Sequence, residues 1–274
     1  MARPGLLLTA FLLLFPLASE ARAQAPDAST LLHYDEPAEQ WVEALPLGNG
    51  RLGAMVFGGT AEDRIQLNEE TVWTGTPHEY HRPGAERYLD EIRSLLLAGD
   101  QRAAEELAAV HFMSAPLRQR AYQAFADLHL SFPRIDPSAV GDYHRELDLR
   151  TAIATTRFRE AGVTHTRELF ASAPHGAVVV RLATDRAGSL SFVARMQGAH
   201  RWSFTRPAGD SALSMRGMVQ DGGVVFEGRV RVIPEGGSLT VDGEEIRVEG
   251  ANAATLIVTA ATNFVSYRDL SGDP

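Results

Sequence analysis

The sequence predicts a mainly β protein, a large antiparallel β-sandwich with an inserted helical hairpin. Short stretches that alternate polar and apolar residues, as half-buried strands do, recur through most of the 274 residues. Turn-forming residues separate these stretches, and the chain has 24 Gly and 14 Pro. The apolar spacing changes to that of a helix only around residues 85–112. No repeat, low-complexity tract or hydrophilic linker divides the sequence, so we expect a single domain.

The first residues have the pattern of a secretory signal peptide. Arg3 supplies a positive charge, Leu6 to Ala18 form an apolar run of 13 residues, and Ala21-Arg22-Ala23 places small residues at the −3 and −1 positions of a cleavage site. The run is too short to cross a bilayer as a helix, which takes about 20 residues. We therefore predict a signal peptide over 1–23 with cleavage after Ala23, a domain over 24–274, and a secreted or periplasmic location.

The first strands are expected between Trp41 and Trp73. Ala54 to Phe57 is a short apolar run that Gly58-Gly59 stops, and Arg64 to Asn68 alternates polar and apolar residues. The next segment, 74–84, contains Gly and Pro residues and is expected to be a loop.

Two helices are expected next, over roughly 85–112. Apolar residues fall on one face of each helix: Tyr88, Leu89, Ile92, Leu95 and Leu96 in the first, and Ala104, Leu107, Ala108 and His111 in the second. Gly99 is expected to end the first helix and Asp100 to cap the second.

Strands and turns are expected again from Asp142 to the end. Asp242-Gly243 lies between two alternating runs and predicts a hairpin with a type I′ turn, in which both central residues have positive φ. The apolar run from Ala254 to Ala260 is expected to be a central strand.

Charge and composition exclude several classes of function. The chain has 26 Lys and Arg against 35 Asp and Glu, a formal net charge of −9, which disfavours nucleic-acid binding and attachment to anionic membranes. It has no Cys, so no disulfide, thiolate nucleophile or Cys-ligated zinc site is possible.

Several local motifs resemble cofactor or metal sites but lack the context for them. Gly48 to Gly53 matches the dinucleotide pattern G-x-G-x-x-G, but Gly58-Gly59 follows too soon for the required helix, so a tight turn is expected. His78 and His81 flank Glu79 in a loop that offers no rigid third zinc ligand. We therefore predict no cofactor and no metal.

The three Trp residues could stack on sugar rings, although a Trp in a β-sandwich usually lies in the core. We expect the core position for Trp41 and Trp202. Trp73 stands at a strand-to-loop transition together with Asn68 and Glu69, where recognition residues are often displayed. Asn68, Glu69 and Trp73 are therefore our candidate substrate-proximal or domain-interface residues, and no catalytic residue is assigned.

Several long motifs resemble the opening domain of glycoside hydrolase family 95, which contains α-L-fucosidases. In order along the chain they are Trp41–Gly59 (WVEALPLGNGRLGAMVFGG), Gln66–Pro77 (QLNEETVWTGTP), Asp127–Leu130, Tyr143–Leu149, Thr166–Ser172, Val232–Gly237 and Ala260–Phe264. The resemblance covers nearly all of the chain after the predicted signal peptide.

This resemblance implies a β-sandwich domain that precedes a catalytic toroid of helical hairpins. Family members hydrolyse terminal α-linked L-fucose with inversion, and their catalytic positions lie in the toroid. None of these positions can be transferred to this chain, which is expected to stop near the end of the sandwich and to be inactive alone. One local departure is Ala124 and Ala126 where the family has Pro and Gly; a positive φ at Ala126 would be strained.

The main hypothesis is therefore an N-terminal, non-catalytic domain of a secreted α-L-fucosidase, with the toroid as its partner. The alternative is a free-standing module that binds carbohydrate, with fucosylated oligosaccharides as ligands. A further alternative is a fragment of a related toroid enzyme, an L-galactosidase or a phosphorylase.

Overall fold

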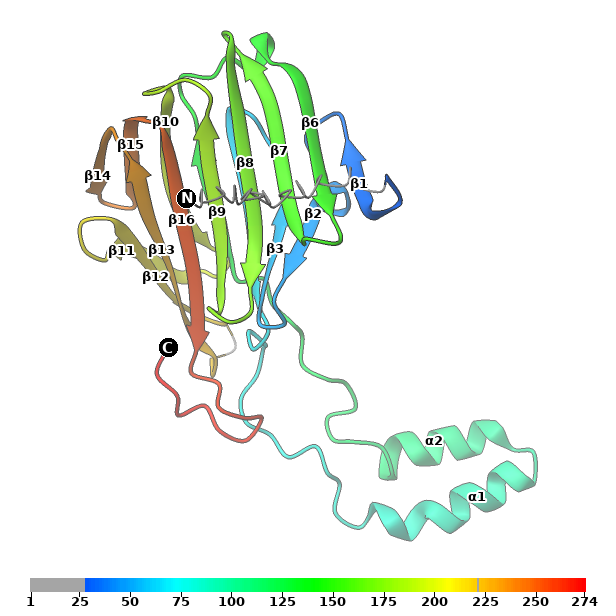
Figure 1. The fold of residues 1–274 in the computed structure, drawn as a ribbon. Coiled ribbons are helices and arrows are strands. Elements are labelled where there is room, and N and C mark those ends of the chain that lie inside the picture. Colours follow the sequence, from blue (N-terminus) through cyan, green and yellow to red (C-terminus); the bar gives the residue numbers. More distant parts are fainter. Residues whose placement is uncertain (1–27, 221) are drawn as a thin grey trace, which may run out of the picture.

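Two antiparallel sheets packed face to face form the protein, which confirms the predicted sandwich (Figure 1). The computed structural model describes residues 28–220 and 222–274, so the predicted signal peptide over 1–23 lies outside the described residues. Within the described residues, no helix is long and apolar enough to cross a membrane.

One sheet has nine strands and the other has seven. The nine-stranded sheet has the order β1 (Leu31–Tyr34), β6 (Gly141–Asp148), β7 (Ile153–Glu160), β8 (Val163–Ser172), β9 (Ala177–Thr184), β16 (Ala253–Thr262), β13 (Val225–Glu235), β12 (Ala212–Met218), β11 (Trp202–Pro207). The seven-stranded sheet has the order β14 (Ser238–Asp242), β15 (Glu245–Ala251), β10 (Leu190–Gly198), β5 (Ala126–Ser131), β4 (Glu62–Glu69), β3 (Leu52–Val56), β2 (Leu45–Gly48). Short 3₁₀ turns occupy Ala28–Thr30, Trp41–Glu43, Ala85–Tyr88 and Pro137–Ala139.

The core lies between the two sheets because alternate side chains of each strand point inward. In β4, for example, the inward residues include Ile65 and Leu67, which are almost fully buried, while Gln66 between them is half-buried on the outer face. The predicted strands around residues 54–57 and 64–68 are thus confirmed. The predicted central strand corresponds to β16, which pairs with β9 on one side and β13 on the other.

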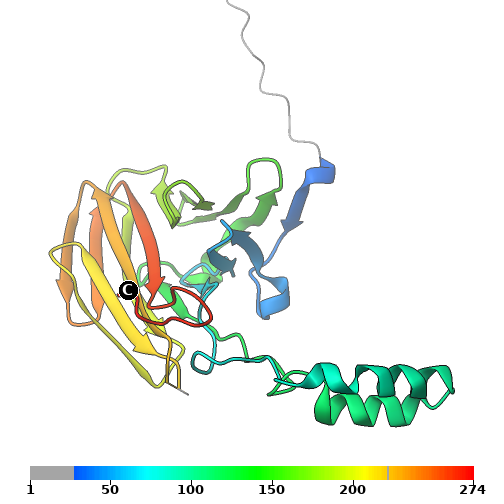
Figure 2. The same ribbon diagram turned by 90° about the horizontal axis from the view of Figure 1, so that it is seen from below.

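The predicted helical hairpin is confirmed and projects away from the sandwich (Figures 1 and 2). It consists of α1 (Leu89–Leu97) and α2 (Gln101–His111), and Asp100 caps α2 by accepting a hydrogen bond from the Ala103 backbone N–H at 3.1 Å. The two helices pack on each other through the buried Ile92 and Ala104. Leu96, expected on the apolar face, is 53% exposed.

The predicted Asp242-Gly243 turn is wrong by one residue, although the hairpin itself is present. Asp242 pairs with Glu245, so Gly243 and Glu244 are the two turn residues. Gly243 has φ +56°, whereas Asp242 keeps a strand conformation. A glycine with positive φ at the first central position is typical of a type II′ turn, which needs only one left-handed residue.

The core positions predicted for Trp41 and Trp202 are also wrong. Trp41 is 55% exposed and Trp202 is 63% exposed. Trp202 lies on the outer face of the edge strand β11, and Trp41 begins a short 3₁₀ turn. Phenylalanines fill much of the core instead, and among them Phe125 and Phe226 pack edge to face with ring centroids 5.4 Å apart.

Ala126 causes no strain in this fold. It lies in β5, opposite Leu67 of β4 and Gly198 of β10, and it has no positive φ. The residue is buried, so its methyl group becomes part of the core rather than a strained turn.

Three polar side chains of the nine-stranded sheet, of which two are buried and one is partly buried, donate hydrogen bonds to loop carbonyls near the seven-stranded sheet. Arg145 of β6 donates to the carbonyls of Glu36 (2.8 Å) and Glu43 (2.7 Å). Tyr143 of β6 donates to the Gly58 carbonyl at 2.7 Å. Burial raises the pKa of Tyr143, so this phenol stays protonated and remains a donor.

The third of these side chains, Arg167 of β8, makes the most contacts. Its guanidinium donates to the carbonyls of Gly59 and Thr60 and pairs with Asp63 of β4 at 2.9 Å. It also lies 3.8 Å from the ring centroid of Phe132. Asp63 in turn accepts a hydrogen bond from the Gly59 backbone N–H at 3.0 Å. Arg167 and Asp63 are both almost fully buried, so neither charge has water as an alternative partner.

Removing Arg167 should therefore destabilise the protein strongly. Arg167→Met leaves the Asp63 carboxylate buried without its cation and should lower the free energy of unfolding by about 3–5 kcal/mol, measured by denaturant titration. Arg157→Met, at an exposed position on β7, is the matched control and should change it by less than about 0.5 kcal/mol. The double variant with Asp63→Leu should be more stable than Arg167→Met alone; an equal or lower stability would contradict the pairing.

Candidate functional site

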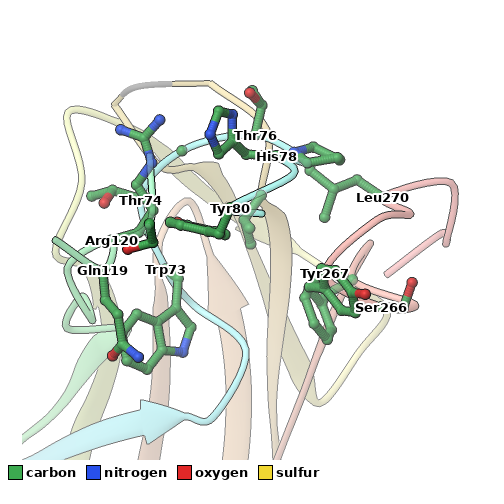
Figure 3. A pocket seen from close by; sticks show the side chains of 15 residues that line it. Trp73, Thr74, Thr76, His78, Tyr80, Gln119, Arg120, Ser266, Tyr267 and Leu270 are labelled. Carbon is green, nitrogen blue, oxygen red and sulfur yellow. The ribbon is translucent and has the colours of Figure 1, made fainter. Parts of the chain in front are cut away.

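A pocket opens at the end of the sandwich from which the helical hairpin projects (Figure 3). Three segments form most of it: residues 73–80, which run from β4 toward the hairpin; residues 114–120, which run back toward β5; and residues 264–270, which follow β16. Val224, which directly precedes β13, completes the lining. The first two segments, together with residues 112–113 and 121–122 that continue the second of them, are called the neck. The cavity has a volume of about 480 Å³, a size that suits a small ligand or a bulky side chain.

Backbone hydrogen bonds hold the two segments of the neck side by side. Trp73 forms a β-bridge with Tyr122, and the Thr74 N–H donates to the Ala121 carbonyl at 2.9 Å. Closer to the hairpin, the ring of His78 donates to the Ala115 carbonyl at 2.6 Å. The neck is thus an ordered continuation of strands β4 and β5.

The C-terminal segment is held beside the neck by the side chain of Asn263. Its amide oxygen accepts from the Val225 N–H at 2.9 Å, and its amide nitrogen donates to the carbonyls of Gly223 and Leu270, each at 3.0 Å. Arg268 reaches the neck through an ion pair with Glu79 at 3.1 Å. One buried amide therefore fixes the wall of the pocket that faces Trp73.

A close backbone approach tightens the base of the pocket. Gly223 has φ +117°, and a Cβ added to it would lie 2.4 Å from the carbonyl oxygen of Gly75. Only glycine allows the turn between β12 and β13 to pack against the neck in this way.

Aromatic rings and polar groups share the walls of the pocket. Trp73 and Tyr80 of the neck lie across the cavity from Tyr267 of the C-terminal segment (Figure 3). Phe264, Val224 and Leu270 add apolar surface. The polar groups come from the following residues: Thr74, Thr76, His78, Ser114, Gln119, Arg120 and Ser266.

The described residues that line the pocket include neither Asp nor Glu. An inverting glycoside hydrolase needs two carboxyl groups, one to protonate the leaving oxygen and one to activate water. The described residues also contain no group of three His, Asp or Glu side chains placed to hold a metal ion. The aromatic and polar side chains that line this pocket can stack on a ligand and form hydrogen bonds with it.

Of the three candidate residues from the sequence, only Trp73 lines the pocket. It is 39% exposed, its indole N–H donates to the Glu70 carbonyl at 2.8 Å, and its ring lies 5.2 Å from that of Tyr122. Asn68 lies on the outer face of β4, opposite Gly53 of β3, and is half-buried.

Glu69 supports the neck from inside the protein. It is fully buried, and its carboxylate accepts from the backbone N–H (2.8 Å) and the hydroxyl (2.6 Å) of Thr71 and lies 3.2 Å from Arg51. The same Thr71 hydroxyl is 2.5 Å from the hydroxyl of Thr262 at the end of β16. Burial, together with the nearby carboxylates of Glu69 and Glu70, raises the pKa of Tyr122.

Sequence patterns did not identify Tyr80, Arg120, Phe264 and Tyr267 as members of the pocket. Tyr80 and Tyr267 are 187 positions apart in the sequence, and only the sheet topology brings their segments together. Their one local signal was aromatic residues within Gly- and Pro-containing loops. The Gly48–Gly53 motif is a hairpin turn, as predicted: Asn49 accepts from the Leu52 N–H at 2.7 Å, and strands flank it on both sides.

Comparison with known proteins shows which family of N-terminal domains this chain resembles. The family described as glycosyl hydrolase family 65, N-terminal domain, matches residues 32–267. "Alpha-L-fucosidase 2" of Arabidopsis thaliana is 31% identical over 278 residues, which cover 91% of this chain and 32% of the relative. "Probable alpha-fucosidase A" of Aspergillus niger is 28% identical over 243 residues, which cover 81% of this chain and 28% of the relative.

These findings confirm the resemblance to α-L-fucosidases drawn from the sequence motifs. The chain spans about a third or less of the length of the curated relatives it matches.

The role of Asn263 in the pocket can be tested by removing its amide. Asn263→Ala leaves two carbonyls and one N–H without a partner and should lower the free energy of unfolding by about 1–3 kcal/mol. Because the C-terminal segment loses its anchor, trypsin should cleave after Arg268 faster than in the original protein, as followed by mass spectrometry. Asn252→Ala, which removes a side-chain hydrogen bond to Gly188 elsewhere, should leave this cleavage rate unchanged. Equal rates in Asn263→Ala would contradict the anchoring role.

Proposed function

Because the chain belongs to the glycosyl hydrolase family 65 N-terminal domain family, we propose that it is the non-catalytic N-terminal domain of an α-L-fucosidase. The whole enzyme removes terminal α-linked L-fucose from oligosaccharides with inversion, and its catalytic groups lie in a toroid of helical hairpins. This domain supports the toroid and borders the entrance to its active site.

The observation that carries this proposal is the gathering of exposed apolar side chains at one end of the molecule. The hairpin and the neck expose Trp73, Leu96, Leu97, Val110, Phe112, Met113, Leu117 and Tyr122, and the C-terminal segment exposes Phe264, Val265 and Tyr267. Leu97, at 90% exposure, has almost no contact with the rest of the chain. Exposed apolar side chains that gather in one region of a protein often mark a surface that a partner covers.

The hairpin is built in a way that suits such a partner. Its helices, α1 of nine residues and α2 of eleven, are short for helices that pack only on each other. Docking on a helical toroid would bury their outer apolar side chains and stabilise them. The pocket beside the neck would then lie at the junction of the two domains, where Trp73 would border the substrate entrance.

The aromatic lining of the pocket also favours the alternative, a module that binds carbohydrate by itself. Aromatic faces pack on the apolar faces of sugar rings, and Gln119, Arg120 and His78 offer hydrogen-bonding groups for hydroxyls. The two functions differ in whether the isolated chain binds sugar.

The purified chain should release no fucose from an aryl α-L-fucoside or from a fucosylated oligosaccharide, because its pocket lacks a carboxyl pair. For a scaffold domain, calorimetry with the same oligosaccharide should show no binding. Millimolar or tighter binding that disappears in Trp73→Ala, and persists in the control Trp41→Ala, would favour the binding module instead. Turnover by the pure chain would overturn the assignment of a non-catalytic domain.

We also propose that the protein is exported with removal of residues 1–23. Expressed with its own first residues in a bacterial host, the exported protein should have the mass of a chain that begins at Gln24. Exported protein that retains Met1 would contradict this assignment.

A further inference from the structure

A second surface, on the outer face of the nine-stranded sheet, carries exposed aromatic residues on the edge strand β11. Trp202 and Phe204 are two positions apart and therefore point to the same side of the sheet. They are 63% and 54% exposed. On the neighbouring strand β12, their cross-strand partners are Met218 and Arg216, respectively.

These side chains line a shallow cleft of about 390 Å³. We call it the aromatic–arginine cleft, and its lining includes Arg201, Trp202, Phe204, Arg216, Met218 and Val225. It shares no residue with the pocket at the neck.

The charge around the cleft differs in sign from that of the whole chain. Arginines lie along the outer face of β11, β12 and β13 and just before β11: Arg201, Arg206, Arg216, Arg229 and Arg231. Glu227 of β13 pairs with Arg229 at 2.6 Å and lies 4.0 Å from Arg216, and Asp273 lies 3.8 Å from Arg216. Ion pairs among the described residues involve Arg216 and Arg229 of this group but neither Arg201 nor Arg206. This local excess of positive charge stands out in a chain of net charge −9.

The combination of exposed aromatic rings and arginines suits a ligand that has both sugar rings and anionic groups. An aromatic face packs on the apolar C–H face of a sugar ring, and a guanidinium binds a carboxylate or sulfate through two parallel hydrogen bonds. A nucleic acid would also offer rings and anions, but the negative charge of the rest of the chain would repel a long phosphate backbone. A short sugar chain with separated anionic groups fits both the size and the charge of the cleft.

We propose that the aromatic–arginine cleft binds an anionic oligosaccharide, with a sugar ring stacked on Trp202 and Phe204 and its carboxylate or sulfate paired with Arg201 and Arg216. The site does not depend on the proposed function, because it shares no lining residue with the pocket at the neck and involves no catalytic step. It would hold the protein on an acidic polysaccharide.

Calorimetry with three hexasaccharides tests this site: a galacturonate oligomer, a sulfated fucan oligomer, and neutral cellohexaose. At least one anionic oligomer should bind, and about tenfold or more tightly than cellohexaose. The carboxylated and sulfated ligands distinguish which anionic group the arginines prefer. Binding should weaken when NaCl is raised from about 50 to 500 mM, because salt screens exposed charges. Failure of both anionic ligands, or equal binding of cellohexaose, would overturn the proposal.

Variants assign the binding to the cleft. Trp202→Ala should weaken binding about tenfold, and Trp202→Phe, which keeps an aromatic face, should restore most of it. Arg201→Gln should also weaken binding and reduce its dependence on salt. The matched controls, Trp41→Ala (55% exposed in the original protein) and Arg157→Gln, should bind as the original protein does. An unchanged thermal unfolding temperature shows that each variant is folded. Unchanged binding of the oligosaccharide by both Trp202→Ala and Arg201→Gln would overturn the assignment of binding to this cleft.

Discussion

The arrangement of the two sheets depends on buried cations that satisfy the carbonyl groups of loops. Arg145 and Arg167 start on the nine-stranded sheet and donate to carbonyls at Glu36, Glu43, Gly59 and Thr60, which lie in the segments that lead into the seven-stranded sheet or connect its strands. These carbonyls have no strand partner, and a buried carbonyl without a donor is costly. The burial of each guanidinium is tolerated because its N–H groups donate hydrogen bonds to several oxygens. The carboxylate of Asp63 also balances the charge of Arg167. The interaction fixes β3 and β4 against β6 and β8.

The pocket at the neck follows from this arrangement. Once β4 is held in place, its last residue, Glu69, lies in the interior and accepts a hydrogen bond from the Thr71 hydroxyl. The same hydroxyl forms a hydrogen bond with the hydroxyl of Thr262 at the end of β16. The chain therefore leaves the two sheets at neighbouring points, toward the hairpin after β4 and into the C-terminal segment after β16. Asn263 then holds the C-terminal segment beside the neck. The aromatic rings of the pocket are brought together by strands that end at the same edge of the sandwich.

The molecule thus presents two surfaces with different chemistry. The hairpin, the neck and the C-terminal segment expose mainly apolar side chains, which suit a partner domain. The aromatic–arginine cleft combines exposed rings with Arg201 and with Arg216, whose ion pairs with Glu227 and Asp273 are long at 4.0 and 3.8 Å, and this combination suits a small anionic ligand. The two surfaces share no lining residue, although the turn between β12 and β13 contributes Val224 to the pocket and leads directly to Val225 of the cleft.

The sequence by itself determined the fold class, the helical hairpin, and the relationship to α-L-fucosidases. These depend on local periodicity, on caps such as Asp100, and on motifs that are contiguous in the chain. It identified Trp73 as a surface residue but not its partners Tyr80, Phe264 and Tyr267, because their proximity comes from strand order rather than from spacing. Only the tertiary structure decided that Trp41 and Trp202 are exposed and that Glu69 is buried. Alternation along a strand predicts that two faces exist, but which face meets the other sheet is decided by pairing between distant strands and by the buried arginines that hold the sheets together.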